Sequence, residues 1–107
     1  MLARELAREV SFLSIGSNDL AQYTLAADRE NEALADRFND RHPAVMKMIA
    51  LTVEAARQEG VALSLCGELA RDTQALPQLL ETGLTRLSVS PSRLEAVKAK
   101  IRQLCKQ

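Results

Sequence analysis

Three short apolar runs in the sequence each lead into polar or reactive side chains. They are followed by Gly16-Ser17-Asn18-Asp19 after residues 12–15, by Cys66-Gly67-Glu68 after residues 61–65, and by Ser88 and Ser90 around residues 86–89. Short apolar runs between helical patterns are typical of buried parallel strands. In parallel α/β proteins, ligands bind at the carboxyl ends of the strands. We therefore expect the three clusters to converge on one site.

The pair Asn18 and Asp19 could bind a metal ion and a phosphate group. A carboxylate is a hard oxygen ligand, and an amide offers both a donor and an acceptor, which suits Mg²⁺ that also contacts phosphate oxygens. The same residue types cap helices, and the spacing alone favours a cap over a ligand by about two to one. Arg29 follows in a polar segment. Its guanidinium matches phosphate or carboxylate, although solvation is the commoner state of such a side chain.

Cys66 offers a thiol between a predicted strand and a glycine. The default interpretation is a small buried apolar side chain. The functional interpretation is a proton donor or nucleophile, with Gly67 permitting close backbone approach and Glu68 orienting the thiol. A nucleophilic dyad lacks a nearby histidine, because the single histidine, His42, precedes a helix and is expected to be exposed.

The elements that would position these side chains alternate between helices and strands. We expect helices over 1–10, from Ser17 or Asn18 onward, from Pro43 to just before Gly60, over 73–81 and from Pro91 onward, with strands over 12–16, 61–65 and 86–89. Residues 28–42 are expected to form a long connection with a helical turn near 32–38. The order predicts an α/β fold with a parallel sheet and right-handed crossovers. Three such strands rarely stand alone, so the sheet looks incomplete.

Composition limits the function classes. The chain has 107 residues, enough for one small domain spanning 1–107. Lys plus Arg and Asp plus Glu both number 14, and aromatic residues make up 3%, so neither nucleic acid nor anionic lipid is an expected partner. No apolar run approaches the ~18 residues of a membrane helix. Cys66 and Cys105 suggest free thiols and a cytoplasmic protein.

The segment Phe12-Leu13-Ser14-Ile15-Gly16-Ser17-Asn18-Asp19-Leu20-Ala21-Gln22-Tyr23-Thr24-Leu25-Ala26-Ala27-Asp28-Arg29-Glu30-Asn31 closely resembles the phosphoenolpyruvate (PEP)-binding domain of enzyme I of the bacterial sugar phosphotransferase system. The resemblance continues through His42-Pro43-Ala44-Val45, Leu65-Cys66-Gly67-Glu68-Leu69-Ala70, Gly83-Leu84 and Leu87-Ser88-Val89-Ser90-Pro91. It therefore covers nearly the whole chain, in the order of the family. Pyruvate phosphate dikinase and PEP synthase share parts of the pattern, but residues 26–31 look more like enzyme I.

The resemblance implies the last three βα units of a (β/α)₈ barrel, which takes ~250 residues. It also implies roles: Asp19 as a Mg²⁺ ligand, Asn18 and Arg29 as contacts to the phosphoryl group, and Cys66 as the acid that protonates C3 of enolpyruvate. Backbone around Gly16 and Ser17 would line the pocket. Glu30 stands where enzyme I often has Gly, and Ser17 where Thr is frequent.

Two functions follow as hypotheses. The first is the C-terminal part of a PEP-protein phosphotransferase, whose full form passes phosphate from PEP to its own histidine and then to the carrier HPr for sugar uptake. The second is a truncated binding module that cannot turn over and pairs its strands with another chain, giving a homo-oligomer such as a dimer. The chain alone is expected to be inactive in phosphotransfer, since two arginines, a metal-binding Glu and the accepting His of the family have no counterpart here.

Overall fold

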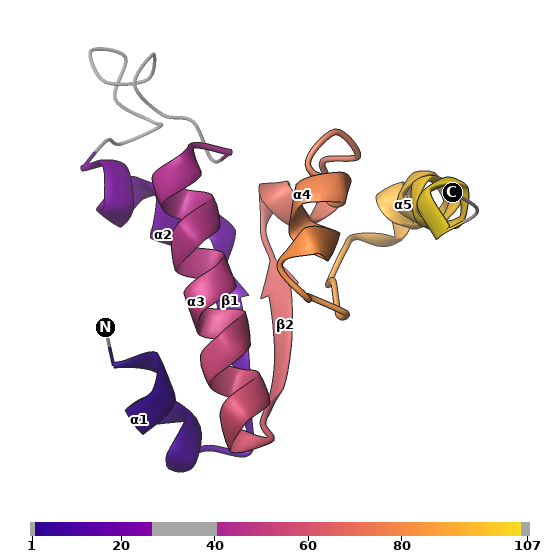
Figure 1. Ribbon diagram of the computed structural model, residues 1–107. Helices are drawn as coiled ribbons and strands as arrows, with labels where there is room; N and C mark the ends of the chain where they lie inside the picture. The colour runs from indigo at the N-terminus through magenta and orange to yellow at the C-terminus, as the bar shows by residue number, and fades with distance from the viewer. Residues whose placement is uncertain (1, 27–40, 106–107) are drawn as a thin grey trace.

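The computed structural model describes residues 2–26 and 41–105. The elements in this part of the chain are, in order, α1 (Ala3–Arg8), β1 (Phe12–Gly16), α2 (Ser17–Leu25), α3 (Pro43–Glu59), β2 (Ala62–Cys66), the 3₁₀ helix η2 (Glu68–Arg71), α4 (Leu76–Glu81) and α5 (Pro91–Cys105). In Figure 1, α3 runs alongside the two strands, and α5 lies beyond α4 at the end of the chain. Residue 29 and the predicted turn over 32–38 lie outside the described residues.

The two strands pair in parallel, with a register that runs from Phe12 opposite Ala62 to Gly16 opposite Cys66. The predicted α/β fold with parallel strands is thereby confirmed. The third strand pairs at the predicted place but is much shorter than predicted. Of residues 86–89, only Leu87 forms a bridge, to Leu65. The Leu65 N–H donates to the Arg86 carbonyl oxygen at 3.1 Å, and the Ser88 N–H donates to the Leu65 carbonyl oxygen at 2.8 Å.

The sheet is covered on one face, so the prediction that these strands are buried holds for that face only. Ile15, Leu63 and Leu65 point into the core and are at most 8% exposed. On the opposite face Phe12 is 69% exposed and Ser14 is also exposed. Side chains alternate between the faces of a strand, so the apolar set packs against the helices while the other set remains open.

Helix α3 forms where the sequence predicts it, because its ends carry strong local signals. Pro43 occupies the first turn, where a missing N–H costs nothing. The imidazole Nδ1 of His42 accepts a hydrogen bond from the Ala44 N–H at 3.1 Å. Gly60 ends the helix with a φ of 68°, a left-handed conformation that glycine adopts without strain. The buried face includes Val45 and Ile49 and forms much of the core.

Helix α1 is shorter than predicted, and its packing differs. Its large apolar side chains are exposed: Leu2 is 67% and Leu6 56% exposed, whereas the small Ala7 is buried. Two arginines attach the helix to the end of α3, with Nε of Arg4 2.7 Å and Nε of Arg8 3.2 Å from the Glu59 Oε1. The hydrogen bond from Arg4 lowers the pKa of Glu59 below its usual range.

The helix predicted over 73–81 begins later, at Leu76, and the structure adds η2 ahead of it. Between the two, Oδ1 of Asp72 accepts a hydrogen bond from the Gln74 N–H at 2.9 Å, which holds residues 72–74 in a turn. Helix α5 begins at Pro91, as predicted. Among the described residues, no helix has the length and apolar character needed to cross a bilayer.

Candidate functional site

The carboxyl ends of β1 and β2 lie side by side, and side chains from the first cluster hold the backbone of the second. Gly16 and Cys66 are directly opposite each other. The buried Ser17 Oγ accepts a hydrogen bond from the Leu69 N–H at 3.3 Å. The Asn18 Oδ1 accepts one from the Glu68 N–H at 3.2 Å. The predicted convergence of the first two clusters is therefore confirmed.

Gly67 makes this contact possible. Its φ of 99° and ψ of −171° belong to a region that residues with a side chain rarely enter. A Cβ at this position would overlap the Ser17 Oγ and lie 3.3 Å from the Ser17 backbone nitrogen. The turn after Cys66 can approach the start of α2 this closely only because residue 67 is a glycine.

The cap interpretation of Asn18 and Asp19 is wrong. Gly16 is the N-cap residue of α2, and no side chain caps the helix. The amide oxygen of Asn18 instead holds the turn after β2, so its role as an acceptor is structural. Its amide nitrogen has no hydrogen-bond partner among the described residues, which leaves two N–H donors for a ligand.

Asp19 lies in the first turn of α2 with an exposed carboxylate. Its Oδ2 lies 3.8 Å from the point where a Cβ on Gly16 would stand, so the carboxylate folds back toward the end of β1. It forms no ion pair within the described residues. No group of three His, Cys, Asp or Glu side chains able to hold a metal occurs in residues 2–26 and 41–105. Asp19 could thus supply one ligand, and a complete metal site needs others.

Cys66 is half-buried at the end of β2, and its thiol contacts β1. Its Sγ donates to the Ile15 carbonyl oxygen at 3.4 Å and lies 3.7 Å from the Ser14 Oγ. The sequence reasoning missed Ser14, because nothing in a single sequence gives the strand register. The predicted orienting partner, Glu68, has its carboxylate 3.7 Å from the guanidinium of Arg71.

The third cluster joins the other two around a hollow of about 300 Å³. Its lining consists of Asn18, Gly67, Glu68, Arg71, Ser88, Val89 and Ser90. Arg71 is the cation of this group and was not singled out from the sequence, although its position three residues after Glu68 on a short helix places both beside the hollow. Arg29 lies outside the described residues. His42 caps α3 and is exposed, as predicted.

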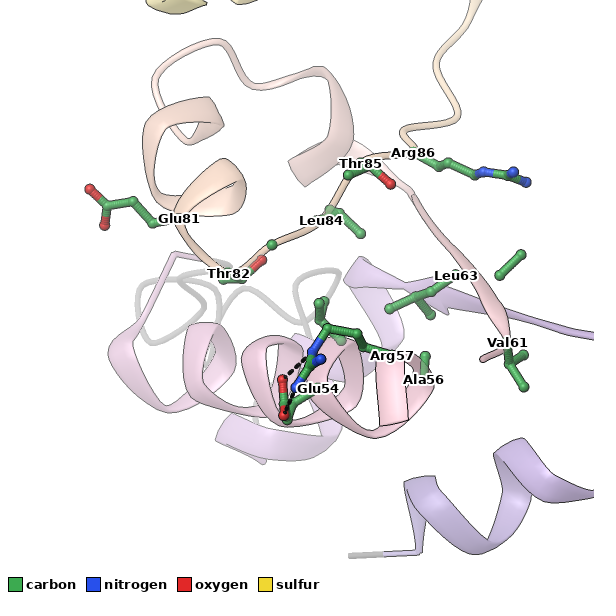
Figure 2. A pocket seen from close by; sticks show the side chains of 13 residues that line it. Glu54, Ala56, Arg57, Val61, Leu63, Glu81, Thr82, Leu84, Thr85 and Arg86 are labelled. Carbon is green, nitrogen blue, oxygen red and sulfur yellow. Dashed lines mark hydrogen bonds and ion pairs between the residues drawn. The ribbon is translucent and has the colours of Figure 1, made fainter. Parts of the chain in front are cut away.

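A second pocket, of about 570 Å³, lies away from these residues, around the amino-terminal end of β2 (Figure 2). It lies between the last turns of α3 and residues 81–86. Glu54 and Arg57 form an ion pair at its wall, with the Arg57 Nε 3.0 Å from a Glu54 oxygen. This contact lowers the pKa of Glu54. The pocket contains none of the predicted site residues, so we place the candidate site at the carboxyl ends of the strands.

Comparison with known proteins identifies the family to which this chain belongs. Residues 1–105 match the family described as PEP-utilising enzyme, PEP-binding domain, and the chain belongs to this family. The resemblance read from the motifs is confirmed.

Relatives share the name phosphoenolpyruvate-protein phosphotransferase. The Bacillus subtilis protein is 43% identical over all 107 residues, and that of Bacillus sp. (strain S) 42%. The Cupriavidus necator protein is 46% identical over 94 residues, or 88% of this chain. The chain spans 19%, 18% and 16% of these three relatives, respectively.

Proposed function

We propose that this chain is the C-terminal part of a PEP-protein phosphotransferase, which transfers the phosphoryl group of PEP to an enzyme histidine and then to HPr. The observation that carries the proposal is the junction of the two strand ends, where Ser17 and Asn18 bind the backbone that follows Cys66. This junction places an amide donor, a carboxylate and a thiol at one edge of the sheet. The names of the relatives support the same activity.

The phosphoryl group would be bound from the β1 side. The Asn18 amide donates to a phosphoryl oxygen, the Arg29 guanidinium holds the group, and the exposed backbone of Gly16 lines the site. Ser17 is fully buried, so the prediction that it contacts the substrate is wrong, and its hydroxyl instead holds the turn after β2. Mg²⁺ is commonly bound by one or two carboxylates together with phosphate oxygens and water, so the single exposed carboxylate of Asp19 fits as one ligand. When bound, the ion neutralises charge on the phosphoryl oxygens.

Cys66 would complete the reaction from the β2 side. When the phosphoryl group passes to the histidine, the P–O bond breaks and its electron pair stays on the enolate oxygen. That oxygen forms the carbonyl at C2, and the C2–C3 electron pair takes the thiol proton. The products are pyruvate and a thiolate, and protonation makes the transfer hard to reverse. The free thiol and its position at the strand end suit this role.

The parallel pairing of β1, β2 and residues 86–88 supports a larger proposal, that these elements are the last three βα units of a (β/α)₈ barrel. The further arginines, the second metal-binding carboxylate and the phospho-accepting histidine would then come from the rest of a longer protein. A cytoplasmic phosphotransferase acting in sugar transport is the natural setting for such a protein. We expect the isolated 107 residues to show no transfer of phosphate to HPr.

A chimera tests the proposal. The matching segment of the Bacillus subtilis relative is replaced by this chain, and PEP-dependent phosphorylation of HPr is measured. The chimera should be active with Mg²⁺. Asp19→Ala and Cys66→Ala should each reduce the rate by about 100-fold or more. Glu95→Ala and Cys105→Ala remove the same groups from exposed positions of α5 and should leave the rate unchanged. A folded but inactive chimera, or full activity in both site variants, would contradict the proposal.

The open sheet face supports the second candidate, a non-catalytic module that self-associates. Phe12 is 69% exposed on an edge-forming strand, which is a surface that another chain could cover. Light scattering of the purified chain, followed by titration with PEP and Mg²⁺, separates the two. A discrete dimer that binds PEP only when Asp19 is intact would favour the module. A monomer or aggregate without binding would assign function to the longer protein alone.

A further inference from the structure

The contact between Ser14 and Cys66 follows from the strand register. Ser14 lies opposite Ser64, and Gly16 lies opposite Cys66, so Ser14 is the diagonal neighbour of the thiol on the open face of the sheet. Diagonal side chains on one face of a strand pair are close enough to interact. Here the Ser14 Oγ and the Cys66 Sγ are 3.7 Å apart, a hydrogen-bond distance when sulfur is involved.

The proton count fixes the direction of this hydrogen bond. A thiol carries one hydrogen, and the Cys66 thiol donates it to the Ile15 carbonyl oxygen at 3.4 Å. The sulfur therefore serves as the acceptor for Ser14, whose hydroxyl hydrogen can rotate toward it. When the thiol gives up its proton, it can no longer donate to the Ile15 carbonyl oxygen, which then faces a negative charge. The Ser14 hydroxyl still donates, and to a charged acceptor, which strengthens the bond.

We propose that Ser14 is a positioning residue for proton transfer, which stabilises the thiolate that Cys66 becomes after it has protonated the product. This inference rests on the proposed role of Cys66 as the proton donor. Other charged residues lie on the elements around Cys66: Asp19 on α2, Glu68 and Arg71 on η2, and Arg86 beside β2. They are the same in every variant described below, so their influence on the thiol cancels in the comparison.

The test compares two side chains of equal shape at position 14. In a Cys105→Ser background, Cys66 is the single thiol, and its alkylation by iodoacetamide is followed across the pH range in which thiols ionise. Ser14→Thr keeps the hydroxyl, whereas Ser14→Val replaces it with a methyl group, and both residues favour strands. Ser64→Val removes a hydroxyl from the residue directly paired with Ser14, and Ser64 has no hydrogen bond to Cys66 in the described structure.

Ser14→Thr should react like the parent. Ser14→Val should be alkylated about fivefold more slowly at neutral pH, with its profile displaced to higher pH, because the thiolate loses a donor. Ser64→Val should match the parent. Equal profiles for the Thr and Val variants, or an equal displacement in Ser64→Val, would overturn the inference.

The chimera separates this inference from the proposed function. Ser14→Val should lower kcat with little change in KM for PEP, and Ser14→Thr should restore it. If Cys66→Ala leaves the chimera active while alkylation still depends on the hydroxyl at position 14, the proton-donor role is wrong and the inference about proton transfer falls with it. If Cys66 is required but the Thr and Val variants turn over equally, the role of Ser14 alone is wrong.

Discussion

Substitution of Gly67 by alanine should be among the most destabilising single changes at the site. The residue has a φ of 99°, and its backbone conformation costs a residue with a Cβ about 1–3 kcal/mol. The new Cβ would also overlap the buried Ser17 Oγ. This oxygen must then move away from the Leu69 N–H, from which it accepts a hydrogen bond at 3.3 Å. Leaving that buried N–H without a partner costs a further ~1–3 kcal/mol.

The two costs together predict a loss of about 2–6 kcal/mol in the free energy of unfolding. Small domains are stable by ~0.05–0.15 kcal/mol per residue, so such a loss is a large part of the total. The assay is urea denaturation followed by circular dichroism. Gly60→Ala is the matched control. Gly60 also has a positive φ, of 68°, but a Cβ there meets nothing within 4 Å, so only the left-handed conformation is penalised, by about 1 kcal/mol.

A double variant isolates the steric part of the effect. In Ser17→Ala/Gly67→Ala the hydroxyl that overlaps the new Cβ is absent, so the two losses should be less than additive. If Gly67→Ala costs no more than Gly60→Ala, or if the two losses simply add, the close approach of the turn to α2 does not have the energetic role argued here.

Two further changes test the attachment and capping of the helices. The pKa of Glu59 is lowered in the folded chain by Arg4, so its carboxylate stabilises the fold above the unfolded-state pKa, and this contribution is lost as the pH falls through the folded-state pKa. The unfolding temperature of the parent should therefore drop more steeply in acid than that of Glu59→Gln, and parallel curves would contradict this. His42→Ala removes the acceptor for the Ala44 N–H and should cost about 1 kcal/mol in urea denaturation, which His42→Asp should restore. A loss in His42→Asp as large as that in the alanine variant would argue against a capping role.

Local signals made the helices predictable, whereas the strands depend on distant partners. Pro43 and Gly60 act through their own backbone, so the sequence alone located both ends of α3. The extent of pairing at Leu87 depends on what lies on its other side, which no local pattern contains. Leu2 and Leu6, four residues apart, illustrate a related limit: helical spacing shows which residues share a face, but packing decides whether that face is covered, and here both are exposed.

The same distinction applies to the site. Residue types identified Asn18 and Cys66 as candidates, but the hydrogen-bond partners that define their roles lie about fifty residues away along the chain. An asparagine side chain can either cap a helix or hold a remote turn, so sequence spacing could not distinguish the two roles. Ser14 became visible only through the register of β1 and β2.

The contacts that set the geometry of the candidate site are internal to these 107 residues. The Ser17 side chain binds the Leu69 backbone and the Asn18 side chain binds the Glu68 backbone. The Cys66 thiol binds the carbonyl of Ile15, so the end of each strand is held by the other. The distance between the carboxylate side and the thiol side of the site is therefore determined without the rest of a longer protein. Charge neutralisation is different, because a phosphoryl group and a carboxylate need more cations than one end of this sheet offers. If the proposed function holds, the placement of the Cys66 thiol beside the start of α2 is a property of this chain, and affinity for a phosphorylated substrate would depend on residues supplied from elsewhere.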